Sequence, residues 1–128
     1  MSYYFQKSVA MEFDKAIETV TEELQKEGFG ILSVIDVKEK LKEKIGVDFR
    51  SYTILGACNP SFAHKALEAE PYIGTMLPCN VIVQEWKDGS VDVAAIDPLA
   101  SMLAVNNKDL QTIAETIRAK LQKVIEQL

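Results

Sequence analysis

The amino-acid sequence predicts an α+β fold, with a mixed, mostly antiparallel sheet of about five strands and helices packed mainly on one face. Three observations lead to this class. Short β-branched segments alternate with amphipathic helical stripes, an Asp-Gly pair separates two apolar segments, and a long helical stripe ends the sequence. The expected order is β-α-β-α-β-α-β-β-α. With 128 residues, the chain is expected to form a single domain over residues 1–128.

The first half alternates predicted strands and helices. Residues 2–7 alternate aromatic and polar side chains, which is typical of a strand, and residues 29–35 are apolar and β-branched, which predicts a buried strand. Between them an apolar stripe predicts a helix that ends at Gly28; its members are Phe13, Ile17, Val20 and Leu24. Asp36 then fits an N-cap with Glu39 as its partner. The short helix that they begin is expected to end at Gly46.

The second half begins with a predicted strand over residues 49–55 that leads into Asn59-Pro60, a typical helix start. Pro71 is expected to end that helix. A hairpin is predicted around Asp88-Gly89. Asn106 or Asn107 is expected to cap a long last helix, whose apolar stripe comprises Leu110, Ile113, Ile117, Leu121, Val124 and Leu128.

Composition excludes several classes of function. The net charge of −5 opposes attraction to nucleic acid or to an anionic membrane. The sequence lacks an apolar run of the roughly 18–20 residues that a membrane span needs. Its first residues do not resemble a signal peptide. A soluble, cytoplasmic protein with two reduced cysteines is therefore expected.

The residues with the most distinctive chemistry are Cys58, His64 and Cys79. A first interpretation is a transition-metal site, with zinc held by two thiolates and one imidazole. A second is a thiol-dependent redox or sulfur-handling enzyme, because Cys58 precedes a helix N-terminus that would stabilise its thiolate. A third is structural, because buried cysteines often act as small hydrophobic residues. His64 also lies one turn before Glu68, a simple ion-pair partner.

The sequence also contains two weaker candidate sites. The segment from Gly56 to Ser61 leads into a helix N-terminus, which can receive an anion, although Asn59 capping its own helix is the simpler interpretation. Asp36, Glu85 and Asp97 stand at or near strand ends, where carboxylates can pair for acid–base work.

Several motifs give the chain a family resemblance over roughly residues 5 to 125. They are Gly28-Phe29-Gly30, residues 41–50, residues 52–60, residues 63–67, Ile73-Gly74, Leu77-Pro78-Cys79-Asn80 and Ile96-Asp97-Pro98. With these motifs the chain resembles the bacterial and archaeal domain-of-unknown-function family number 302. The resemblance implies a compact mixed-sheet domain that tends to form homodimers. The family's motif residues correspond to Cys58, Asn59, His64, Cys79 and Asn80, and no activity comes with them.

The sequence therefore supports a cytoplasmic homodimeric domain that binds a small ligand or metal ion, with zinc as the first candidate metal. The expected ligand-binding residues are Cys58, Asn59, His64, Cys79 and Asn80, and Cys58 is the catalytic candidate if the protein is an enzyme. A partner-binding module without a site is the remaining alternative. Since helices are expected on one face of the sheet, the dimer is expected to form through the other face or through Met102 and Leu103.

Overall fold

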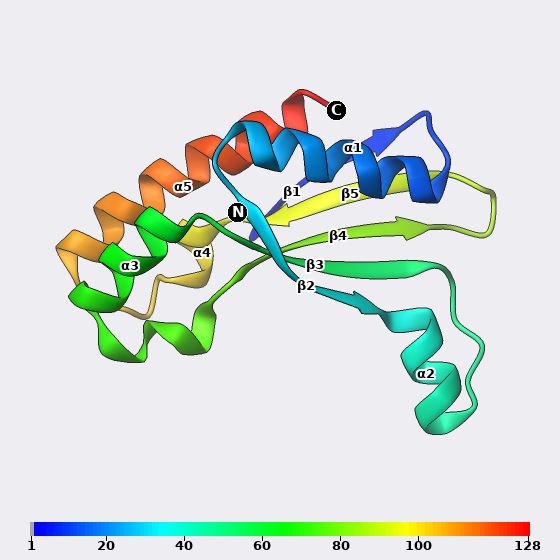
Figure 1. Cartoon of the computed structure of the whole chain (residues 1–128), viewed down its shortest axis with the longest axis horizontal. Helices are drawn as coiled ribbons and strands as arrows, with labels where there is room; N and C mark the ends of the chain where they lie inside the picture. Colours follow the sequence, from blue (N-terminus) through cyan, green and yellow to red (C-terminus); the bar gives the residue numbers. More distant parts are fainter. Residues whose placement is uncertain (1) are drawn as a thin grey trace.

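The computed structural model describes residues 2–128, and its centre is a five-stranded sheet in the order β1-β5-β4-β3-β2 (Figure 1). The strands are β1 (Tyr4–Val9), β2 (Gly30–Asp36), β3 (Tyr52–Cys58), β4 (Cys79–Glu85) and β5 (Val91–Ile96). Each neighbouring pair within this part of the chain is antiparallel. The predicted α+β class is confirmed, and the sheet is antiparallel throughout rather than mixed.

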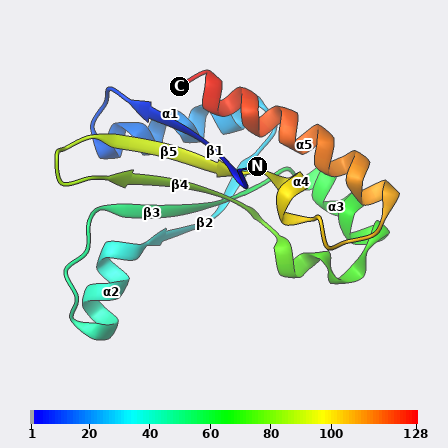
Figure 2. The same cartoon turned by 180° about the vertical axis from the view of Figure 1, so that it is seen from behind.

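The helices lie mainly on one face of the sheet, as predicted (Figures 1 and 2). They are α1 (Phe13–Lys26), α2 (Val37–Ile45), α3 (Pro60–Ala69), the 3₁₀ helix η1 (Pro71–Met76), α4 (Pro98–Ser101) and α5 (Lys108–Glu126). The main core forms where α1 and α5 cover the sheet. It includes Ala16, Val20, Leu24, Leu55, Val81, Val83, Val93, Leu121 and Val124. Alternate strand residues point into this core because side chains alternate across a strand.

Two of the helix caps and the hairpin turn predicted from the sequence are present in the structure. The backbone N–H of Glu39 donates to Asp36 Oδ1 at 3.0 Å, and that of Leu110 donates to Asn107 Oδ1 at 3.2 Å. The hairpin turns at Gly89, whose φ of 86° favours glycine. These features depend on a few neighbouring residues, which is why sequence alone predicts them.

The strand β2 corrects one prediction. It was expected to be buried, but it is an edge strand in which Leu32 and Val34 are 68% and 63% exposed. The helix α2 that follows contains no buried residue in the described structure and projects beyond this edge (Figure 1). Of the apolar residues of β2, Ile31 packs against the core, while Leu32, Val34 and Ile35 remain exposed.

Candidate functional site

The two cysteines come together where the sheet meets α3. Cys58 is the last residue of β3, and Cys79 is the first residue of β4, where it pairs with Ala57 in the strand register. Both residues line one cavity of about 40 Å³. The chain's only two thiols are thus placed at one site by the pairing of two neighbouring strands.

The cavity is almost entirely apolar. Its wall comes from the strand ends, from the inner sides of α3 and α5, and from the segments 77–79 and 98–102. The lining residues are Phe29, Ala57, Cys58, Asn59, Phe62, Ala63, Ala66, Leu77, Pro78, Cys79, Pro98, Met102, Leu110, Ile113, Ala114 and Ile117. A volume of this size holds about two or three water molecules, but an apolar wall offers water few partners.

Burial controls the chemistry of Cys79. It raises the pKa of the Cys79 thiol to about 11, and the nearby Cys58 adds to the rise. Desolvation disfavours the thiolate, which is the reactive and metal-binding form. Cys79 is therefore a neutral thiol at pH 7 unless a bound cation replaces its proton.

His64 does not join the cysteines. It lies on the outer side of α3, where its side chain is 77% exposed and Nε2 is 3.3 Å from Glu68 Oε1. Among residues 2–128, no group of three or more His, Cys, Asp or Glu side chains could hold a metal ion. The three-ligand zinc site predicted from Cys58, His64 and Cys79 is therefore not assembled. The helix turns the imidazole outward, and the simpler ion pair with Glu68 is present instead.

The two asparagines of the predicted site also separate. Asn59 lines the cavity and occupies the N-cap position of α3, but its side chain makes no capping hydrogen bond within the described residues. Asn59 Nδ2 instead donates to the carbonyl of Glu27 at 3.4 Å. The expected cap is thus wrong, because the side chain ties α3 to the end of α1. Asn80 lies on the opposite face of the sheet from Cys79, since strand residues alternate.

Two of the three weaker carboxylate candidates, Asp36 and Asp97, have structural partners. Asp36 caps α2, as described above. Asp97 is buried, and its Oδ2 lies 3.0 Å from Arg118 Nε. These contacts show how the two side chains are held in the fold, and neither carboxylate lines the cysteine cavity.

A second concave region, which the sequence did not predict, lies on the face of the sheet that the helices leave open. It is a depression of about 470 Å³ that includes Arg50, Trp86 and Asp92. The one available signal was the placement of Arg50 between the aromatic residues Phe49 and Tyr52. No local pattern indicates that Trp86 and Asp92 join them, because β4 and β5 bring these residues from later in the chain.

Comparisons with known proteins agree on one family. Residues 5–128 match the family model described as "Domain of unknown function DUF302". A crystal structure of an uncharacterized conserved DUF302 protein from Bacillus stearothermophilus is 31% identical, with a TM-score of 0.91 over 98% of each chain. An uncharacterized protein from Aquifex aeolicus (strain VF5) is 31% identical over 58% of this chain. That match spans 45% of the relative's own length.

Within residues 2–128, no helix combines the length and the apolar character that crossing a bilayer requires.

Proposed function

The chain belongs to the DUF302 family, and from that premise we propose that it is a binding domain that holds one soft monovalent cation, such as Cu⁺, between Cys58 and Cys79. One observation carries the proposal: the chain's two cysteines line the same small apolar cavity. The cation would replace the thiol protons and be held by two thiolates, without His64.

The chemistry of the cavity supports a soft cation. Thiolates select soft metals such as Cu⁺, whereas hard cations prefer carboxylate oxygens, which this wall lacks. Zinc usually takes three or four Cys, His or carboxylate ligands, and no group of three such residues meets here among residues 2–128. The raised pKa of Cys79 makes binding pH-dependent, because the metal must displace a tightly held proton.

A competitive titration tests the proposal. Reduced protein is titrated with Cu⁺ against a chromogenic chelator, and in parallel with Zn²⁺. We expect one Cu⁺ per chain and an affinity for Cu⁺ well above that for Zn²⁺. Cys58→Ser and Cys79→Ser should each weaken Cu⁺ binding at least 100-fold, while His64→Ala, the matched control, should leave it unchanged. Absence of stoichiometric Cu⁺ binding, or equal binding by all variants, would refute the proposal.

A thiol-dependent reaction at Cys58 is the second candidate function. The observation in its favour is that Cys58 lies two residues before the first residue of α3, a ten-residue helix. The N–H groups at a helix start stabilise a nearby thiolate. This function predicts that iodoacetamide alkylates Cys58 in the Cys79→Ser variant faster than it alkylates a free thiol at pH 7. If iodoacetamide does not alkylate Cys58, this second function is ruled out. The cation-binding and purely structural alternatives then remain.

Homodimer formation is the second part of the proposal, and the exposed residues of β2 and α2 favour this edge as the interface. Leu32, Val34 and Ile45 are each more than 60% exposed. The strand β2 carries none of the Lys or Pro residues that usually protect an edge from pairing. A two-fold axis would pair β2 with its copy in antiparallel orientation.

Light scattering coupled to gel filtration tests the dimer. Wild-type protein should elute at twice the chain mass, and Val34→Lys should shift it towards monomer. Leu103→Lys is the matched control, because Leu103 is 78% exposed but lies outside this edge. A monomeric wild type, or a dimer broken only by Leu103→Lys, would contradict the assignment. A cytoplasmic location, where both thiols stay reduced, completes the proposal.

A further inference from the structure

Arg50 is held in a fixed position on the open face of the sheet. Its guanidinium carbon lies 4.3 Å from the centroid of the Trp86 ring and 4.4 Å from that of Phe49. Its Nε donates a hydrogen bond to Gln84 Oε1 at 3.0 Å. Stacking and this hydrogen bond orient the planar group, and its two terminal nitrogens remain as donors suited to a carboxylate.

Asp92 lies in the same cluster and has an unused acceptor. It is opposite Gln84 in the strand register, and its Oδ2 accepts from Trp86 Nε1 at 3.1 Å. Its Oδ1 is buried and has no hydrogen-bond partner among residues 2–128. A buried acceptor without a partner lowers stability by about 1–3 kcal/mol, and by more if it is charged. A ligand that donates a hydrogen bond to this oxygen would remove that cost.

The depression that contains these groups has the size of a ligand site. Its volume of about 470 Å³ falls within the range of roughly 300–1,000 Å³ that is typical of small-molecule sites. Ile82, Ala94 and Ile96 supply an apolar floor, and Tyr52 adds an aromatic wall. Arg50 is its one cationic lining residue in the described chain.

We propose that this depression binds a small organic acid with a flat apolar body, a carboxylate that pairs with Arg50, and an N–H or O–H group that donates to Asp92. The positive charge of Arg50 selects the carboxylate. The apolar floor accepts the body of the ligand, and Asp92 gains the donor that it lacks. To reach the buried Oδ1, the ligand displaces neighbouring side chains; Gln6, whose Nε2 makes a long contact of 3.4 Å with the adjacent Oδ2, is one such neighbour.

Calorimetric titration with three probes tests each part of the inference. The probes are 4-hydroxybenzoate, which has both polar groups, benzoate, which lacks the donor, and phenol, which lacks the carboxylate. We expect 4-hydroxybenzoate to bind at least tenfold more tightly than either of the others. Quenching of Trp86, the chain's only tryptophan, should follow the same saturation curve.

Variants assign the two contacts. Arg50→Gln should weaken 4-hydroxybenzoate and benzoate at least tenfold, and Asp92→Asn should weaken only 4-hydroxybenzoate. Lys65→Gln, on α3, is the matched control for loss of one positive charge and should have no effect. Thermal unfolding of each variant verifies the fold. The inference is overturned by lack of saturable binding, by equal binding in all variants, or by a dimer that Arg50→Gln dissociates, since the face would then be occupied by a second copy.

Discussion

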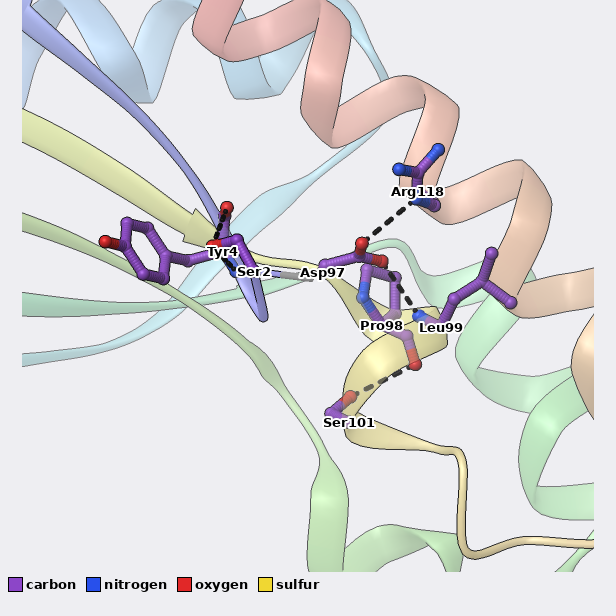
Figure 3. Close-up of polar contacts among 7 residues, drawn as sticks. All are labelled: Ser2, Tyr4, Asp97, Pro98, Leu99, Ser101 and Arg118. Carbon is purple, nitrogen blue, oxygen red and sulfur yellow. Dashed lines mark hydrogen bonds and ion pairs between the residues drawn. The ribbon is translucent and has the colours of Figure 1, made fainter.

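Arg118 Nε lies 3.0 Å from Asp97 Oδ2, and this ion pair joins α5 to the turn that follows β5 (Figure 3). The Asp97 side chain is only 3% exposed, and its Oδ1 also accepts the backbone N–H of Leu99 at 3.1 Å. The guanidinium of Arg118 lies over the ring of Phe5 as well. The Asp97–Arg118 pair therefore links the end of β5, α4 and α5, and the Arg118 guanidinium extends this junction to Phe5 of β1.

Arg118→Met should destabilise the protein because it leaves the Asp97 carboxylate buried without its cation. The expected loss is about 2 kcal/mol, less than the 3–5 kcal/mol typical of fully buried pairs, because Arg118 is 37% exposed. Urea unfolding measures it. Lys123→Met is the control, because that lysine pairs with Glu27 while 60% exposed and should cost no more than about 1 kcal/mol. Equal losses in the two variants would contradict the role of Asp97.

Gly56→Ala should destabilise the protein because a methyl group has no room at this position. A Cβ there would collide with Ser33 Oγ and lie 2.9 Å from Pro78 Cγ. Overpacking of this kind costs about 1–3 kcal/mol, which thermal or urea unfolding can resolve. Gly30→Ala in the neighbouring strand is the control, since nothing lies within 4 Å of its added carbon. A neutral Gly56→Ala would show that Ser33 and Pro78 move freely.

Burial of Cys79 should make stability fall at high pH. The folded pKa is about 11 against an ordinary value of 9.0, so the folded state retains the thiol proton more tightly than the unfolded state. The resulting stabilisation, about 2–3 kcal/mol by proton linkage, is fully present below pH 9 and is lost as the pH rises towards 11. Unfolding of wild type and Cys79→Ala between pH 8 and 11 should show their difference in free energy shrinking. A constant difference would contradict this burial effect.

Two asparagines at helix starts should differ in their contribution to stability. Asn107 Oδ1 caps α5, and its Nδ2 donates to the carbonyl of Ala69 at 2.9 Å. Asn59 makes only the long 3.4 Å contact to Glu27. Asn107→Ala should therefore cost about 1–2 kcal/mol, and Asn59→Ala less than about 1 kcal/mol, in urea unfolding. The reverse order would show that Asn59 is the stronger cap.

Local pattern predicts most of the secondary structure. The stripe that begins at Leu110 predicts α5, the Asp88-Gly89 pair predicts the hairpin, and Asp36 predicts the start of α2; all three are confirmed. Each depends on backbone geometry and side-chain spacing within a few residues, which is the information that a sequence carries directly.

The candidate site could be predicted only in part. The sequence identifies Cys58 and Cys79 as the chain's two thiols, but the register of β3 and β4 decides that they share a cavity. His64 lies outside the cysteine site because its angular position on α3 turns its side chain towards Glu68. Arg50, Trp86 and Asp92 meet only because three strands pair, so no local signal joins them.

By itself, the sequence determined the longer helices α1, α2, α3 and α5, the hairpin, the α+β class and the two residues with thiol chemistry, but not the short helices η1 and α4. The tertiary structure decided which apolar strand lies at the edge, which side chains meet, and which face of the sheet remains open. The physical reason is that hydrophobic periodicity indicates which residues within one segment face the core and which face solvent. Strand order and register depend instead on contacts between segments that are distant in the sequence. The strand β2 illustrates the difference, because its composition is that of a buried strand while its position leaves Leu32 and Val34 exposed.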